Sequence, residues 1–229
     1  MLHDGARAAV DLYWLPLGAG GHSVRVNGIV YEAISSLLQR RPRCDLYHAA
    51  LEILAPSGRF AIEMTPVPNG RGWERGVVAD GAVGTRSAGQ LRIFRYEIRR
   101  WRDGDIPDLG DAVASPVRIS DDPALAQRVL GLLPSTPTPT WGRDELRTGE
   151  MWTCNSVMSW VLTRAGVDPD TIAFPPRARA PGWDAGVTVA RRRLPSAQVA
   201  TAAGPGQPRV GRVASACQSP RPVAVRTWT

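Results

Sequence analysis

A chain of 229 residues, 43% hydrophobic and 21% charged, is long and apolar enough to bury one core, with an extension or at most a second small domain. Its formal net charge of +7 arises in residues 191–229, which hold seven arginines and no acidic residue, so that residues 1–190 carry 21 basic and 21 acidic side chains. Because this expected folded part has no net charge, we do not expect the protein to bind nucleic acid.

The cysteines and the hydropathy pattern indicate a compartment. No window approaches eighteen consecutive apolar residues, so we expect no integral membrane segment. The first ten residues lack the apolar stretch of a secretory signal. Cys44, Cys154 and Cys217 are too widely spaced to indicate a disulfide framework or a zinc site. We therefore expect a cytoplasmic protein, and the sequence implies no metal or organic cofactor.

The N-terminal part of the chain is predicted to contain a hairpin and a short helix. An apolar run from Asp11 to Leu17 leads into a Gly-rich turn at 18–21. Asn27-Gly28 between β-branched residues is typical of a two-residue hairpin. Apolar residues at helical spacing then predict a short helix to about Gln39, which Pro42 ends.

The middle of the chain is predicted to contain strands. Residues 45–54 and 60–65 alternate as two strands should, and Pro56-Ser57-Gly58 between them is typical of a turn. Residues 66–90 are rich in Gly and Pro and are predicted to form a long excursion. Residues 91–98 supply bulky side chains and predict a further strand.

Two longer helices are predicted in the second half of the chain. The first is capped by Asp121 or Asp122, has proline in its first turn and runs to Leu133. The second spans residues 154–165, with Thr153 as its N-cap and a glycine directly after it.

These elements predict an α+β fold in which an antiparallel sheet packs against a few helices. We expect one domain over residues 1–190. Residues 191–229 mix Ala, Gly, Pro, Arg, Ser and Gln with few large apolar residues, so they predict a disordered basic tail.

Cys154 is a candidate for chemistry because it is the first residue of the second long helix. Its thiol would lie near the positive end of the helix dipole and near free backbone N–H groups. Such groups favour a thiolate and stabilise an oxyanion formed after its attack. Alternatively, Cys154 is a small apolar residue that lines up with Met158 and Val161 on a buried face.

His48 is the second candidate because it alone, of the three histidines, lies inside a strongly predicted strand. Alternation places His48, Ala50 and Glu52 on one face of that strand and the residues between them on the other. Small alanines beside His48 leave room for another group to approach. The alternative is an ordinary core or surface histidine.

A third catalytic residue depends on the turn after this strand. A tight two-residue turn at Pro56-Ser57 would pair His48 with Thr65 and place Glu63 diagonally across from His48, close enough to orient its ring. A bulged turn would shift the register by one residue and remove that relation. Glu63 is our first choice, with Glu52 and Thr65 as the alternatives.

The segment His48-Ala49-Ala50-Leu51-Glu52-Ile53, followed roughly a hundred residues later by a cysteine that opens a helix, resembles the circularly permuted papain-like group. That group includes relatives of the NlpC/P60 peptidases, the lecithin:retinol acyltransferase-like proteins and the PPPDE peptidases. The resemblance covers roughly residues 11–166. It implies that Cys154 is the nucleophile and His48 the base. Residues 11–101 are also similar to uncharacterised proteins of high-GC bacteria.

Two functions from different classes are expected on this basis. The first is a cysteine hydrolase or acyltransferase that acts on an amide, ester or thioester, so that a peptide, lipid or other acyl compound would be its substrate. His48 would take the Cys154 proton, and thiolate attack on a carbonyl would form a thioester. The second is a catalytically silent papain-like domain that binds a ligand or regulates a partner, because Thr153 stands where the group often has asparagine.

Overall fold

The computed structural model describes residues 8–17, 44–67 and 76–192. Within these ranges the strands are β1 (Ala9–Pro16), β2 (Asp45–Ala55), β3 (Gly58–Pro66), β4 (Val77–Ala82), β5 (Arg95–Arg102), β6 (Val117–Ser120) and β7 (Ala178–Arg179). The α-helices are α2 (Pro123–Leu132), α3 (Cys154–Arg164) and α4 (Trp183–Arg192). The predicted hairpin at 27–28, the helix to residue 39 and the tail beyond residue 192 lie outside the described residues.

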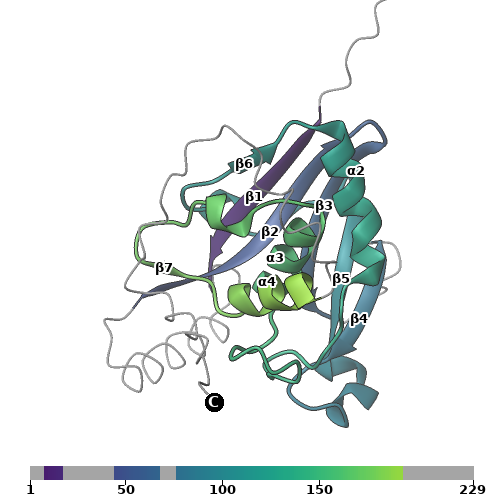
Figure 1. Ribbon diagram of the computed structural model, residues 1–229. Helices are drawn as coiled ribbons and strands as arrows, with labels where there is room; N and C mark the ends of the chain where they lie inside the picture. The colour runs from purple at the N-terminus through teal and green to yellow at the C-terminus, as the bar shows by residue number, and fades with distance from the viewer. Residues whose placement is uncertain (1–7, 18–43, 68–75, 193–229) are drawn as a thin grey trace, which may run out of the picture.

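The described strands form one mainly antiparallel sheet in the order β4-β5-β3-β2-β1-β6, with the short β7 pairing in parallel with β2 (Figure 1). The β2–β3 hairpin closes with Ala55 opposite Gly58, so its turn has two residues. This is the tight turn at Pro56-Ser57 that would place Glu63 on the same face as His48. Gly58 has a φ of 128°, a value that favours glycine over residues with a side chain. The hairpin therefore has the first of the two registers that the sequence left open.

Two helices begin where their caps were predicted. Asp122 accepts hydrogen bonds from the backbone N–H groups of Ala124 and Leu125 at the start of α2. Thr153 caps α3 in a reciprocal capping box with Ser156. Gly166, with a φ of 101°, follows the last turn of α3.

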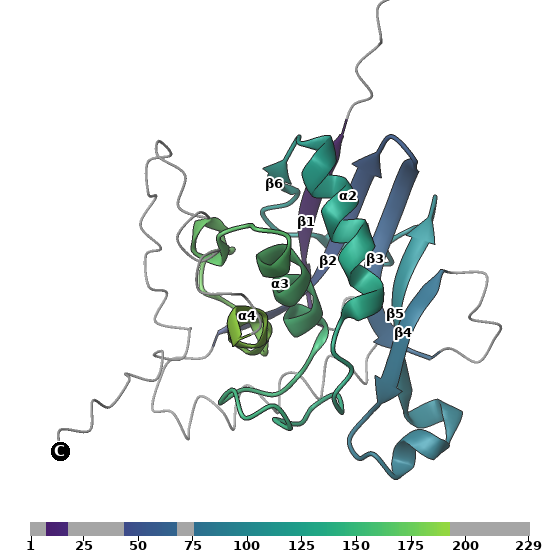
Figure 2. The same cartoon turned by 45° about the vertical axis from the view of Figure 1, so that its right-hand side comes forward.

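The three described α-helices cover the same face of the sheet (Figures 1 and 2). The main hydrophobic core lies between these helices and the sheet, and it includes Trp14, Leu51 and Met158. The opposite face carries a smaller apolar cluster, whose buried members are Leu15, Ala50, Ala61 and Ile106. The α+β fold with an antiparallel sheet and a helical layer is therefore confirmed.

Three predictions were wrong. The excursion at 66–90 contains strand β4 and the short 3-10 turn η2 (Ala88–Gln90). The strand expected from residue 91 begins only at Arg95, because residues 92–94 form the 3-10 turn η3. Helix α4 was missed, since its glycine, valines and threonine are residues of low intrinsic helix propensity. It also extends the folded part slightly beyond residue 190.

Candidate functional site

Cys154 lies where the sequence places it, at the first position of α3. Its thiol is close to the backbone N–H groups of Ala49, Asn155 and Cys154 itself. The neighbouring Asn155 donates a hydrogen bond of 3.0 Å from Nδ2 to the carbonyl of Tyr47, so the start of α3 is attached directly to β2. Cys154 therefore has backbone donors around its sulfur, as expected for a residue at a helix N-terminus.

Burial opposes ionisation of this thiol. Cys154 is 7% exposed and belongs to the main core. Burial raises the pKa of Cys154 to about 11, although the three backbone N–H groups act in the other direction. At neutral pH the side chain is a thiol and not a thiolate. The alternative interpretation, that Cys154 is a buried apolar residue, fits this environment.

The other described cysteine behaves differently. Cys44 is disulfide-bonded, with a partner outside the described residues, whereas Cys154 is free. The sequence predicted no disulfide framework, and this single bond of Cys44 was not foreseen. Wide spacing in the sequence says little about the distance between two cysteines after folding.

His48 lies in β2, directly opposite Leu15 of β1. Burial lowers the pKa of His48 to about 4, and the carboxylate of Asp108 offsets this only in part. Its imidazole makes no hydrogen bond with any described residue. The ring is therefore neutral at physiological pH, and no carboxylate of the described residues is hydrogen-bonded to it to fix its tautomer.

The structure places Cys154 and His48 beside the same stretch of β2 but does not join them. Cys154 packs in the core with Ala49, on the face that the helices cover. His48 points to the other face, together with Ala50, because successive side chains alternate across a strand. No hydrogen bond links the thiol and the imidazole. The expected thiol–imidazole pair is thus not formed, and sequence reasoning missed this because it did not assign α3 to a face.

Glu63 lies on the same face as His48, as predicted from the register, but it is engaged elsewhere. Its Oε1 accepts a hydrogen bond of 2.9 Å from Arg99, which also donates two hydrogen bonds to Oε2 of Glu97 at 3.0 and 3.1 Å. All three residues are buried. Of the alternatives, Glu52 pairs with Arg59 at 2.8 Å. None of the proposed third residues hydrogen-bonds His48.

The polar side chains around Cys154 make buried hydrogen bonds with the chain that leads into α4. Thr153 and Asn155 both donate hydrogen bonds to the carbonyl of Pro181, at 2.7 and 3.0 Å. Ser156 donates to the carbonyl of Gly182 at 2.7 Å, and Ser159 donates to that of Trp183, also at 2.7 Å. These bonds fasten α3 to the chain that enters α4. They give the polar residues of Thr153-Cys154-Asn155-Ser156 a structural role.

A hollow of about 400 Å³ lies at the other end of the sheet, where β4 and β5 meet. Its lining combines aliphatic residues with two acids and two arginines, namely Val67, Val77, Val78, Ala79, Asp80, Arg92, Arg95 and Glu97. Its volume is within the range of small-ligand pockets. Sequence reasoning did not find it, although the alternation Tyr96-Glu97-Ile98-Arg99 already places two charged residues on one face of a strand.

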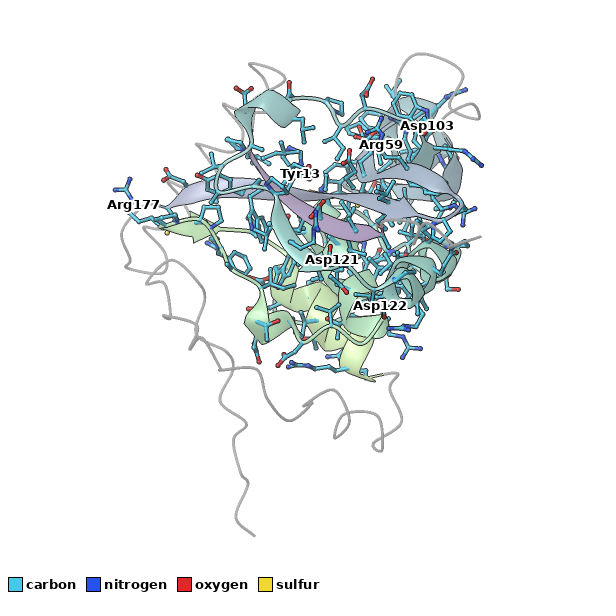
Figure 3. The ribbon with its side chains drawn as sticks, turned by 90° about the horizontal axis from the view of Figure 1, so that it is seen from above. Tyr13, Arg59, Asp103, Asp121, Asp122 and Arg177 are labelled. Atoms are coloured by element: carbon cyan, nitrogen blue, oxygen red, sulfur yellow. The ribbon has the colours of Figure 1, made fainter. Side chains whose placement is uncertain are left out.

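Figure 3 shows the two faces of the sheet from above. Tyr13 and Arg59 lie on the side away from the helices, whereas Asp121 and Asp122 lie on the helical side. Within the described residues, no three His, Cys, Asp or Glu side chains are grouped so that they could hold a metal ion. No described helix is long and apolar enough to cross a membrane.

Comparison with known proteins supplies no relative. No family model, curated protein or solved structure matches this chain.

Proposed function

We propose that this chain is a papain-like domain that binds a ligand and does not use its cysteine as a nucleophile. The observation that carries the proposal is the environment of Cys154 and His48 on β2. A thiol whose pKa is about 11 and an imidazole whose pKa is about 4 hold their protons in the wrong order for a thiolate–imidazolium pair. A catalytic base must also reach the proton it removes, and no such hydrogen bond is present.

The papain-like interpretation is supported by the position of α3. Its N-terminus, which carries Cys154, packs across the strand that carries His48, and Asn155 hydrogen-bonds the backbone of that strand. The order of the two residues and the antiparallel sheet also agree with the permuted group. The difference from an active papain-like site is that the side chains of Cys154 and His48 lie on opposite faces of the sheet.

The binding role is supported by the hollow between β4 and β5. It combines an aliphatic wall with charged side chains, a combination typical of ligand sites. Leu91 and Ile93, on either side of the hollow-lining Arg92, are 60% and 66% exposed, and apolar side chains exposed close together are found at interaction surfaces.

A second function remains supported by one observation. The backbone N–H groups of Ala49, Cys154 and Asn155 surround the Cys154 sulfur, and such donors stabilise the oxyanion of acyl transfer. A cysteine hydrolase or acyltransferase would need His48 and Cys154 to meet in a substrate complex.

Alkylation of the native, full-length protein tests the two functions. Iodoacetamide, a small uncharged reagent, would be reacted over a range of pH, with labelling of Cys154 followed by mass spectrometry. The rate would be compared with that of the same cysteine in denaturant, and His48→Ala with the control His22→Ala. We expect native Cys154 to label at least about tenfold more slowly than in denaturant, because it is buried and protonated.

The effect of His48 decides between the functions. If the domain is silent, His48→Ala and His22→Ala leave the labelling rate of Cys154 equally unchanged. Rapid labelling of Cys154 near neutral pH that His48→Ala abolishes, and His22→Ala does not, would overturn the proposal in favour of the thiol enzyme.

A further inference from the structure

The segment that joins β4 to β5 exposes three large apolar side chains close together. Leu91, Ile93 and Phe94 are 60%, 66% and 42% exposed, whereas most large apolar residues of the described chain are buried. Figures 1 and 2 show the segment projecting beyond the ends of the two strands. Apolar side chains gathered on a projection are presented to a partner and not to the protein's own core.

The projecting segment is held in shape by its own hydrogen bonds. The Val83 N–H donates to the Phe94 carbonyl at 2.8 Å, which closes the segment at its base. Within the segment, the Leu91 N–H donates to the Ala88 carbonyl and the Phe94 N–H donates to the Leu91 carbonyl, both at 2.9 Å. Because these turns are already formed, a partner that contacts the three apolar side chains need not order the segment first.

The segment also carries positive charge without any acidic residue. Residues 81–96 contain three arginines, Arg86, Arg92 and Arg95, and no aspartate or glutamate. The ion pair of Arg86 with Glu145 is exposed on the arginine side, where 81% of the side chain is accessible. An exposed pair of this kind is weak, so it does not prevent the arginine from facing an anionic surface.

One further cation stands at the base of the segment. Arg143 donates a hydrogen bond of 2.6 Å from Nε to the carbonyl of Gly84. Gly84 follows Val83, whose N–H binds the Phe94 carbonyl, so this guanidinium is held at the point where the segment leaves the sheet. Arg143 is exposed and forms no ion pair with a described carboxylate. Its outer N–H groups are therefore available to a phosphate.

The size of the apolar group favours a lipid bilayer over a folded protein as the partner. Three side chains at these exposures offer on the order of a few hundred Å² of apolar surface, whereas a specific protein interface buries about 800 Å² on each partner. A bilayer needs no matching shape, because its interfacial region accepts leucine and phenylalanine side chains while its phosphates attract basic residues. The projecting shape, the apolar tip and the arginines near its base together match that surface.

We propose that residues 84–94 attach the protein to the surface of a membrane that contains anionic phospholipids. Leu91, Ile93 and Phe94 enter the boundary between the headgroups and the acyl chains, and Arg143 binds a lipid phosphate at their base. Attachment of this kind needs no helix that crosses the bilayer. The inference goes beyond the proposed ligand-binding function, because it concerns the projecting segment and neither the hollow nor Cys154.

The first test observes the contact in the full-length protein. Labelled with para-fluorophenylalanine, the chain gives three fluorine NMR signals, from Phe60, Phe94 and Phe174, and Phe94→Leu assigns one of them. The protein would be mixed with nanodiscs of equal parts phosphatidylcholine and phosphatidylglycerol, with and without a lipid that carries a nitroxide on its acyl chain. We expect the nitroxide to remove the Phe94 signal and to leave those of Phe60 and Phe174, which pack in the core. Equal broadening of all three signals, or of none, would overturn the inference.

The second test changes the apolar tip. Leu91→Ser combined with Ile93→Ser alters only exposed side chains, so the variant should fold normally. In sedimentation with vesicles of the same two lipids, we expect it to bind at least about tenfold more weakly than the wild type. The matched control is Leu109→Ser, which alters a 37% exposed leucine beyond the opposite end of β5 and should bind as the wild type does. Wild-type binding of the double variant would show that the tip does not contact lipid and would sink the inference.

The third test separates Arg143 from the general positive charge of the chain. Arg143→Gln should weaken binding to the anionic vesicles about fivefold, as for loss of one basic residue at the membrane surface. Arg102→Gln removes the same charge from a 66% exposed position at the opposite end of β5 and should leave the binding unchanged. Equal losses in the two variants would contradict the role of Arg143. These outcomes are independent of the proposed function, because thiol labelling at Cys154 uses no lipid.

Discussion

The sulfur of Cys154 lies against the backbone N–H of Ala49, the residue that follows His48 in β2. The thiol and the imidazole therefore meet the same strand at adjacent residues, yet from different faces. A difference of one residue in the position of the histidine would change which face it occupies. The sequence resembles that of a thiol enzyme, but in the structure the buried thiol and the half-buried imidazole do not meet.

We expect the His48 imidazole to remain neutral down to about pH 4, because burial lowers its pKa from the ordinary 6.5. Since the folded pKa is the lower one, His48 contributes stability that is present above pH 6.5 and is lost as the pH falls towards 4. NMR titration of the ring protons checks the pKa directly. A midpoint near 6.5 would contradict the burial of this ring.

Glu150 should make the protein less stable as the pH rises. Burial, followed by the charge of Asp184, raises the pKa of Glu150 to about 7, while its carboxylate accepts a hydrogen bond from the Gly182 N–H. Because the folded pKa is above the ordinary 4.5, the stabilising effect is complete below pH 4.5 and is lost as the pH rises towards 7. Glu150→Gln should therefore gain stability over the wild type above pH 7, by on the order of 1–3 kcal/mol.

Glu145 provides a control of opposite sign. Its hydrogen bonds with Arg86 and Thr140 lower its pKa to about 2, so its contribution is present above pH 4.5 and is lost as the pH falls towards 2. Glu145→Gln should lower the melting temperature at pH 7, whereas Glu150→Gln raises it. Thermal melts at pH 5 and pH 8 measure both, and parallel behaviour of the two variants would contradict the assignment for Glu150.

Replacing Gly186 by alanine should prevent α3 and α4 from packing. A methyl group at this position would lie 2.0 Å from the carbonyl oxygen of Ser156 and 2.1 Å from Oγ of Ser159. Both atoms belong to the tightly bonded face of α3, so the helices would have to separate. We expect a loss of about 3 kcal/mol or more in the free energy of unfolding, as for strong overpacking of a core.

Gly131 of α2 is the matched control for this substitution. An added methyl group there has no atom within 4 Å, and alanine is the better helix former. Gly131→Ala should therefore stabilise the protein by about 0.5–1 kcal/mol, measured by urea denaturation like the first variant. Similar losses in both variants would mean that the helix contact at Gly186 is not as close as the structure places it.

Removing Arg99 should be far more damaging than removing a more exposed arginine. Arg99→Met would leave Glu63 and Glu97 buried without their guanidinium, which costs about 3–5 kcal/mol. In the control Arg59→Met, which breaks a half-exposed pair with Glu52, the loss should be below about 1 kcal/mol. Urea denaturation at pH 7 checks both variants, and equal losses would show that the Arg99 cluster is solvated.

Local sequence signals determined the elements that begin at a helix cap or are joined by a tight turn. Asp122 and Thr153 cap the helices they were expected to cap, and the two-residue turn set the β2–β3 register. Caps and tight turns depend on residues a few positions apart, so the sequence carries their full information. Helix α4 has no such cap signal in the sequence. It packs against α3, and packing of this kind supplies most of the stability of a helix in a protein.

The candidate site was determined only in part by the sequence. That Cys154 opens a helix and that His48 faces the side of Glu63 both follow from local periodicity. Which face of β2 receives α3 does not, because it depends on contacts between residues more than a hundred positions apart, such as Asn155 with Tyr47. The tertiary structure alone decided that the thiol lies on one face of the sheet and the imidazole on the other. It also decided that Arg99 pairs with both Glu63 and Glu97.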